Sequence, residues 1–501
     1  GKSICTTSTL TFSADEAGRY FILISATNAG GTTEKEIRID VFQLDVPTIS
    51  IADADKGFKV LQGSELTITP IVDSFLETSY SWQINGEDIS NELTCTLPTI
   101  ELGEYQVRFA THNEDGDDEV TFKVEVCSPD QVDFNWTFLQ TEYNMSAGRT
   151  IRIKPVDVNN ALDAVYTWTV DNEQVQSGEN DTYLFTSEQQ GEHTVKVEMK
   201  NSYILATQTL KVNVCPPAGT YQRKISATSS ASMNKVYEYL PAPGQFINEN
   251  HNTITMAEAC TYAEERINQT AYVSLGGFGG YIIVGFDHSI VNDGDYNIAI
   301  TGNAFDGSSE PGIVWVMQDE NGDGLPNDTW YELRGSEYGK AETWQDYAVT
   351  YHKPTGIQLP TPWTDNHGQS GSIDYLGAFH RQDYYYPAWV KEKQYTLRGT
   401  RLKERNYDQS GNGTYWVNDS YEWGYADNFS AIDRLTDDDN YNAGPSDNHF
   451  KISHAVTFDG KDANLKYVDF IKVQVGVNSK SGWLGEISTE VFGIKDFNML
   501  K

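Results

Sequence analysis

"YSWQINGED" (residues 80–88) returns in altered form as "YTWTVDNEQ" (166–174), so that Trp82 and Trp168 stand 86 residues apart. A period of about 85–90 residues holding several short alternating strands is the size of an immunoglobulin-like sandwich. A large indole at this place in each copy is expected to fill the space between two sheets. Three more segments align without gaps and share a glycine (Gly18, Gly103 or Gly191): "TLTFSADEAGRY" (9–20), "TCTLPTIELGEY" (94–105) and "TYLFTSEQQGEH" (182–193).

The repeats predict the order of the domains. A partial module over 1–45 lacks the tryptophan half, and complete modules follow over 46–127 and 128–215. The repeat signal ends at "CPPAG" (215–219), and 216–501 is predicted to form a larger, jelly-roll-like β domain. Its one helix is expected over 255–267, where Thr255 and Glu258 form a capping box. The predicted fold class is all-β: tandem immunoglobulin-like sandwiches, then a jelly-roll-like domain with one short helix.

The module pattern resembles a known repeat family. The "G-x-Y…N-x-x-G" arrangement and "YSWQING" are similar to PKD-type repeats, a β-sandwich family common on extracellular proteins. The resemblance covers 46–215 and implies that these modules act as a stalk or spacer. Exposed acidic stretches such as "HNEDGDDE" (112–119) are then expected to be solvated hairpin tips.

Composition excludes several classes of partner. The chain has 36 basic and 72 acidic residues, a formal charge of −36, which repels nucleic acid and anionic membranes and attracts Ca²⁺. An equally simple interpretation is that the excess carboxylates keep a large β protein soluble.

The five cysteines show no zinc-ligand spacing, and no apolar run approaches the ~20 residues of a membrane span. The start at Gly1 indicates a processed or recombinant product.

"VWVMQDENGDGLPNDTWYEL" (314–333) is the candidate metal site. Counted from Asp319, the loop begins like the EF-hand pattern D-x-[DN]-x-[DN]-G, but Trp330 stands at position 12 and strands flank the loop. We expect a structural calcium ion rather than a catalytic one, with Glu332 in reserve as a ligand. The alternative is a metal-free hairpin of turn-forming residues, and "TDDDN" (436–440) is a weaker second candidate. The predicted ligands are Asp319, Asn321, Asp323, the Leu325 carbonyl, Asn327 and Asp328.

Aromatic residues gather between Trp363 and Phe429, interleaved with Gly, Asn, Asp, Gln and Arg. Alternation is poor there, which indicates long loops, and flat rings with polar tips suit a sugar face or a corrin. The alternative is a second hydrophobic core beneath those loops. His367 and His380 could ligate cobalt, although a surface or hydrogen-bonded histidine is the simpler interpretation. The predicted ligand-binding residues are Trp363, Tyr384, Tyr385, Tyr386, Trp389, Tyr415, Trp416 and Trp423.

Three segments of 216–501 carry a second resemblance: "GGFGGYIIVGFDHSI", "SEPGIVWVMQDENGDGLPNDTWYELRGSEY" and "VDFIKVQ…GEISTEV". They look like the C-terminal domain of PKD-repeat cell-surface lipoproteins of gut Bacteroidetes, a family often encoded beside vitamin B12 uptake systems. The resemblance implies an exported protein of the cell surface or outer membrane that handles a cobamide, with an outer-membrane transporter as a possible partner. No lipid anchor is visible in this chain.

Catalytic motifs offer little support for an enzyme. The chain has no G-x-S-x-G elbow and no H-E-x-x-H, and its 72 acidic residues do not single out a glycosidase pair. We therefore expect a non-catalytic surface protein that captures a small ligand, preferably a cobamide. The alternatives are a glycan-binding protein, a carbohydrate-active hydrolase on a jelly-roll scaffold, or a purely structural adhesin.

Overall fold

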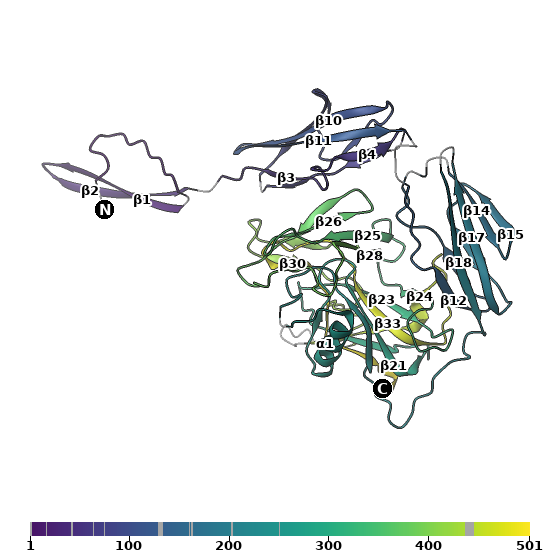
Figure 1. Cartoon of the computed structure of the whole chain (residues 1–501). Helices are drawn as coiled ribbons and strands as arrows, with labels where there is room; N and C mark the ends of the chain where they lie inside the picture. Colours follow the sequence, from purple (N-terminus) through teal and green to yellow (C-terminus); the bar gives the residue numbers. More distant parts are fainter. Residues whose placement is uncertain are drawn as a thin grey trace. The chain divides into compact units, whose positions relative to one another are not determined.

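The computed structural model describes residues 3–16, 18–41, 44–63, 65–74, 76–128, 134–159, 161, 164–201, 204–249, 251–435 and 445–501. Over these residues the chain is all-β, and α1 (Met256–Asn268) is the one α-helix (Figure 1). Two compact units are present. The first comprises Gly1–Phe58, Pro70–Cys95 and Glu104–Val124; the second comprises Lys59–Thr69, Thr96–Gly103 and Glu125–Lys501.

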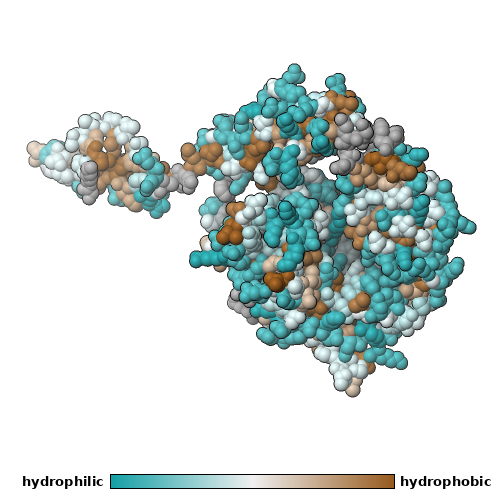
Figure 2. Space-filling view, viewed as in Figure 1, coloured by the Kyte–Doolittle hydropathy of each residue, from teal (hydrophilic) through white to brown (hydrophobic). Residues whose placement is uncertain are grey.

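The first unit begins with one hairpin. Strands β1 (Gly18–Asn28) and β2 (Gly31–Val41) pair antiparallel over their whole length. The hairpin has few strands to cover its apolar side chains, so Phe21 and Leu23 are more than half exposed. Figure 2 shows hydrophobic surface, in brown, on the part of the molecule at the left that contains this hairpin. In the described part of 1–45, β1 and β2 are the only strands.

The rest of the first unit contains the first of the two repeated tryptophans. Trp82 lies on β7 and is fully buried, with its ring 4.5 Å from that of Phe109 and 6.5 Å from that of Phe122. The strands here are β3 (Thr48–Ser50), β6 (Ile71–Asp73), β7 (Ser79–Ile84), β8 (Glu87–Ser90), β10 (Gly103–Asn113) and β11 (Gly116–Cys127). Strands β11, β10, β7 and β8 are neighbours in this order, and β3 pairs with β6. The predicted tryptophan core is therefore present. Short strands β4 (Phe58–Leu61), β5 (Leu66–Ile68) and β9 (Cys95–Leu97) complete this part of the chain.

The second unit contains the next sandwich, which we call the third module (134–215). Its larger sheet has the order β12-β18-β17-β14-β15, and β13 pairs with β16 in a second sheet. Trp168 on β14 is fully buried and stacks on Tyr183 of β16 at 5.5 Å, so the indole joins the two sheets. The strands are β12 (Glu142–Ser146), β13 (Thr150–Ile153), β14 (Val165–Val170), β15 (Glu173–Gly178), β16 (Tyr183–Thr186), β17 (Gly191–Lys200) and β18 (Leu205–Cys215).

Two of the three shared glycines, Gly103 and Gly191, have a common structural role. Gly103 begins β10 and Gly191 begins β17, with φ of +145° and +128°. Side-chain-bearing residues avoid this backbone region, so glycine is required where the chain turns into each long strand. Gly18 also begins a strand, β1, but without a φ in this region. Gly103 and Gly191 thus mark equivalent points of the two modules that contain the repeated tryptophans.

The C-terminal β domain (216–501) is built mainly on antiparallel sheets. The six-stranded sheet has the order β19-β21-β33-β23-β24-β32, from β19 (Lys235–Leu240), β21 (Tyr281–Val291), β33 (Tyr467–Val475), β23 (Gly312–Met317), β24 (Trp330–Leu333) and β32 (Ala455–Val456). The four-stranded sheet has the order β27-β26-β25-β28, from β27 (Ser370–Ile373), β26 (Thr361–Asp365), β25 (Trp344–His352) and β28 (Gln394–Arg401). A three-stranded sheet has the order β31-β22-β35, from β31 (Ser446–Phe450), β22 (Ile298–Gly302) and β35 (Gly493–Asp496). Two further sheets have two strands each. One pairs β20 (Val273–Ser274) with β34 (Glu490–Val491), and the other pairs β29 (Asn406–Asp408) with β30 (Trp416–Asn418).

The helix packs on this core as the sequence predicts. The Thr255 side chain accepts the Glu258 N–H, and the Glu258 carboxylate accepts the Thr255 N–H, so the capping box is present. Ala259 and Ala263 face inward and are fully buried in the main core, which also takes side chains from β21, β23 and β33. The described part of the domain also contains the short 3₁₀ turns η2 (Ile452–His454), η3 (Gly482–Leu484) and η4 (Phe497–Met499).

Candidate functional site

The predicted calcium loop joins two paired strands. It leaves β23 and enters β24, which pair antiparallel with Met317 opposite Trp330, so the strand–loop–strand context is confirmed. The Asp319 carboxylate accepts the N–H groups of Gly322 at 2.7 Å and Gly324 at 3.0 Å. These bonds hold the turn in shape with or without an ion.

Other polar groups of the loop also meet one another. Asp323 accepts the side-chain amides of Asn321 and Asn327, each at 2.8 Å. Asp328 is 3% exposed, and one of its carboxylate oxygens has no hydrogen-bond donor. Burial, with the neighbouring carboxylates, raises the pKa of Asp328 to about 8. The calcium assignment of this loop stays a prediction, and the weaker second candidate, "TDDDN" (436–440), lies outside the described residues.

The same loop contacts the third module. Asn144 of β12 donates to the Asn327 carbonyl at 3.2 Å, and the Ser146 N–H donates to Glu320 Oε2 at 3.1 Å. Arg149 lies with its Nε 3.3 Å from Glu320 Oε1 and donates to Gln318 at 3.0 Å. The loop therefore ties the C-terminal domain to the module that precedes it.

Three of the predicted ligand-binding aromatics are core residues, which corrects the prediction for them. Tyr385, Tyr386 and Trp389 are 2%, 1% and 6% exposed and belong to the main hydrophobic core. Their polar ends are satisfied inside the protein: Tyr386 donates to the Glu392 carbonyl and Trp389 to the Tyr239 carbonyl. Because no ring face reaches solvent, these side chains stabilise the domain and present no surface to a ligand.

The other five predicted aromatics are spread over the domain. Trp363 and Tyr384 are half-buried against the core, and half-buried Trp423 packs on His454 at 5.1 Å. Tyr415 is 57% exposed. Trp416 is half-buried against Gly482, where a Cβ would lie 2.2 Å from the indole nitrogen. Among the described residues, no ring contact joins any two of these five aromatics, and only Trp416 adjoins the surface described next.

An exposed aromatic surface that the sequence did not single out lies beside Trp416. Phe379 and Trp483 are 64% and 50% exposed, with ring centroids 6.1 Å apart, and Leu484 is 41% exposed. We call Phe379, Trp483 and Leu484 the Trp483 surface. "SGWLG" (481–485), a tryptophan between glycines in a turn, was the available signal. This motif lies outside the aromatic-rich segment between Trp363 and Phe429, so the search for aromatic-rich sequence does not find it.

Two loops are locked together beneath the Trp483 surface. At Gly485, whose φ is +87°, a Cβ would lie 2.8 Å from the Gln245 amide and 2.9 Å from Leu376. Gln245 in turn donates to the Leu484 carbonyl at 2.6 Å, while the Phe379 and His380 N–H groups bond to the Leu376 carbonyl. The rings are therefore presented on a turn of fixed shape.

The two histidines considered as cobalt ligands are already engaged. His367 stacks on Trp344 at 4.2 Å with the rings 11° from parallel. His380 lies with Nδ1 2.6 Å from the Glu249 carboxylate and packs on Phe246 at 4.7 Å.

Cys260 is half-buried on the helix face that packs on the core, and burial raises the pKa of its thiol.

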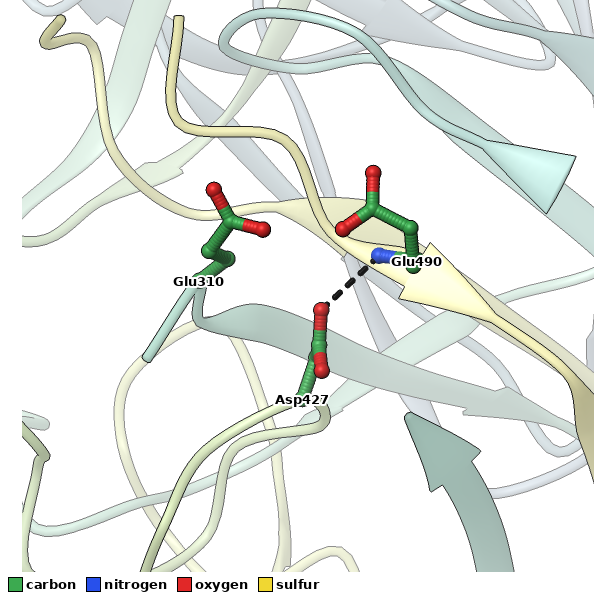
Figure 3. Close-up of side chains that lie close together, drawn as sticks. All are labelled: Glu310, Asp427 and Glu490. Atoms are coloured by element: carbon green, nitrogen blue, oxygen red, sulfur yellow. Dashed lines mark hydrogen bonds between the residues drawn. The ribbon is translucent and has the colours of Figure 1, made fainter. Parts of the chain in front are cut away.

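Three carboxylates from distant parts of the chain meet inside the domain (Figure 3). Glu310 precedes β23, Asp427 follows a buried stretch that ends in Ala426, and Glu490 begins β34. One oxygen from each lies within 4.8 Å of the others. Burial raises the pKa of all three carboxyls, and each also feels the charge or the hydrogen bond of another member. We call Glu310, Asp427 and Glu490 the acid triad.

Comparison with known proteins identifies the modules. The family model described as "PKD-like domain" matches residues 46–113 and 118–201, so these segments are PKD-like. PKD-like domains are typical of extracellular proteins, and no helix in the described part is both long and apolar enough to cross a membrane. No curated protein matches the chain.

Several solved structures are similar to part of the chain. Fibronectin(III)-like modules of Clostridium thermocellum CbhA share 15% identity at a TM-score of 0.19, over 36% of this chain and all of theirs. A chimeric titin Z1Z2 shares 20% at 0.21, over 34% of this chain and 98% of its own. An endo-fucoidan hydrolase from glycoside hydrolase family 107 shares 12% at 0.19, over 40% of this chain and 34% of its own. The family match and the buried tryptophans Trp82 and Trp168 agree on two PKD-like β-sandwich segments ahead of the larger β domain.

Proposed function

We propose that this chain is an extracellular, non-catalytic binding protein whose C-terminal β domain captures a small ligand on the Trp483 surface. The observation that carries the proposal is the exposed pair of Phe379 and Trp483, two large rings in contact with each other and with solvent. Apolar rings left exposed in this way commonly mark a binding site. The PKD-like modules serve as the stalk.

The Trp483 surface has features of a prepared site. Its turn is fixed by Gly485 and Gln245, so little ordering is needed when a ligand binds. A polar rim is available next to it, where Lys480 pairs with Asp374 at 2.9 Å and Arg381 is exposed. Flat apolar faces beside polar groups fit a ligand with an apolar face and polar edges.

The preferred ligand is a cobamide, and a glycan is the alternative. The preference rests on the resemblance to lipoproteins associated with vitamin B12 uptake, and a corrin offers the flat face that the two rings suit. A cell-surface or outer-membrane location and delivery to a transporter belong to this proposal. A sugar face stacks on exposed aromatics equally well.

A hydrolase is less well supported than binding. The acid triad is the candidate for a glycosidase pair, since one oxygen of each carboxylate lies within 4.8 Å of the others. Asp427 and Glu490, however, are 1% and 4% exposed. A polysaccharide has no access to carboxylates that are covered to this extent.

A structural calcium ion in the 319–328 loop is part of the proposal. Carboxylate, amide and carbonyl oxygens are the ligands that Ca²⁺ prefers, and the 319–328 segment carries carboxylate and amide side chains at short spacing. The buried Asp328 oxygen without a donor supports a cation here, because a buried carboxylate oxygen is costly to leave unpartnered. The ion's role is to hold the junction with the third module.

Calorimetric titration tests the binding proposal. The full chain is titrated with cyanocobalamin and, separately, with a panel of soluble glycans, and the variant Trp483→Ala is compared with Tyr407→Ala. Tyr407 is 44% exposed and lies on β29, outside the Trp483 surface. We expect one ligand class to bind, with a tenfold or greater loss of affinity only in Trp483→Ala, as is common for an aromatic anchor. No binding of either class, or equal binding by both variants, contradicts the proposal.

A further inference from the structure

The acid triad is held in place by backbone groups from several segments. The Asn303 and Ala304 N–H groups donate to Asp427 Oδ1 at 2.7 and 2.8 Å, and the Glu490 N–H donates to Oδ2 at 2.9 Å (Figure 3). Gly302 makes this approach possible, since a Cβ there would lie 2.5 Å from Asp427 Oδ1. The three donors fix the Asp427 carboxylate in one orientation.

The triad has no basic partner in the part of the chain that the structure describes. The charges that act on Glu310, Asp427 and Glu490 come from one another, and the groups that stabilise their ionised forms are hydrogen-bond donors such as the Ser488 N–H. Two buried carboxylates this close cannot both stay ionised without compensation. The cluster must therefore hold protons or a cation.

A second observation points to a ligand. Glu490 is 4% exposed, and its Oε1 is buried without any hydrogen-bond donor. Figure 3 shows the Glu490 and Glu310 carboxylates side by side, with that of Asp427 reaching toward the Glu490 backbone. Glu486, a further buried acid that feels the charge of Glu310, also has an unpartnered oxygen. Leaving such oxygens without a partner is costly, and a cation would remove the cost.

We propose that Glu310, Asp427 and Glu490 bind a divalent, oxygen-preferring cation inside the C-terminal β domain. Carboxylate oxygens are the ligands of hard cations such as Ca²⁺ and Mg²⁺. The ion joins the segment before β23, the loop around Asp427 and the start of β34, and so stabilises the domain. This site is separate from the 319–328 loop in its residues and does not depend on the proposed ligand.

Ion stoichiometry tests this assignment directly. The full chain is stripped with EDTA, dialysed against Ca²⁺ or Mg²⁺ in separate arms, and its bound metal counted by mass spectrometry. Glu310→Gln is compared with Glu342→Gln, an exposed carboxylate that pairs with Lys403 at 2.7 Å. We expect Glu310→Gln to bind one equivalent less than both the unaltered chain and Glu342→Gln, and its melting temperature to respond less to the ion. The arm with the greater stoichiometry identifies the preferred ion.

Equal stoichiometry in all three proteins would overturn the proposal and leave the triad as a proton-sharing cluster. Because Glu310→Gln could fail to fold, the unaltered protein supplies an independent test. Crystals grown with Mn²⁺ are expected to show an anomalous peak between the three carboxylates. Two results contradict the assignment. One is a crystal that shows Mn²⁺ elsewhere but no anomalous peak between the three carboxylates, and the other is a crystal grown with Mn²⁺ that shows no bound metal at all.

Discussion

Ser146 and Glu320 are joined by a buried hydrogen bond of 3.1 Å, in which the Ser146 backbone N–H donates to the Glu320 carboxylate. The bond links the third PKD-like module to the acidic loop of the C-terminal domain. Arg149 approaches the other oxygen of the same carboxylate at 3.3 Å. The loop that looks like a calcium site in the sequence is thus also one of the points where two parts of the second unit are attached to each other.

Replacement of Arg149 is expected to weaken this attachment. Arg149→Met removes the positive partner of Glu320, whose side chain is 1% exposed, and leaves a buried carboxylate uncompensated. Loss of one partner of a buried pair costs about 3–5 kcal/mol. Chemical denaturation measures the effect. Arg152→Met is the matched control, because Arg152 pairs with Asp346 at 3.0 Å in a more exposed position and such pairs contribute about 0–1 kcal/mol. Equal costs for the two variants contradict the buried role of Arg149.

Replacement of two loop aspartates tests the calcium prediction. The double variant Asp319→Asn, Asp323→Asn is expected to have a lower melting temperature in calcium than the unaltered protein. The difference between its melting temperatures in calcium and in EDTA should also be smaller. The reason is that two of the predicted carboxylate ligands become neutral. Differential scanning calorimetry in calcium and in EDTA measures both effects. Identical melting of the unaltered protein in the two buffers would show that no calcium stabilises the chain, at this loop or elsewhere.

Core and surface aromatics are expected to differ in stability. Trp389→Ala should cost about 3–5 kcal/mol, because it empties a buried site in the main core. Trp483→Ala should stay within about 0.5 kcal/mol of the unaltered protein, since half of the side chain already faces solvent. Urea denaturation of both variants distinguishes them. A large loss in Trp483→Ala would mean that Trp483 has a structural role.

Glu332 gives the C-terminal domain a defined pH dependence. Burial raises its pKa from 4.5 to about 7, although Thr400 donates to it and Lys472 lies nearby. A carboxyl whose pKa is raised in the folded state binds its proton more tightly there, so stability falls as pH rises from about 4.5 to about 7. The loss is roughly 3 kcal/mol at most. Glu332→Gln should remove this loss, as measured by urea denaturation at pH 5 and pH 7. A Glu332→Gln variant with the same pH dependence as the unaltered protein contradicts the shifted pKa.

Local patterns explain why much of the fold could be predicted. The Thr255–Glu258 capping box and the repeated tryptophans at Trp82 and Trp168 depend on near neighbours and on a fixed repeat length, which the sequence displays directly. The strands on both sides of the acidic loop were visible as apolar runs. Each of these features has the same structural role in the protein as in the prediction.

The candidate sites depend on contacts that the sequence does not display. Tyr385, Tyr386 and Trp389 look like loop residues by their poor alternation, yet long segments fold inward and bury them. The acid triad brings together three single acids among 72, each in an unremarkable context. Trp483 was one tryptophan in a short turn, and only the three-dimensional arrangement places Phe379 beside it.

The central claim is that ligand capture takes place on the Trp483 surface. Hydroxyl-radical footprinting of the full chain, read by mass spectrometry with and without saturating cyanocobalamin or the glycan that binds, measures this most directly. We expect the ligand to reduce oxidation of Phe379 and Trp483, with exposed Tyr407 unchanged. Unchanged oxidation of Phe379 and Trp483 at saturating ligand would contradict the account.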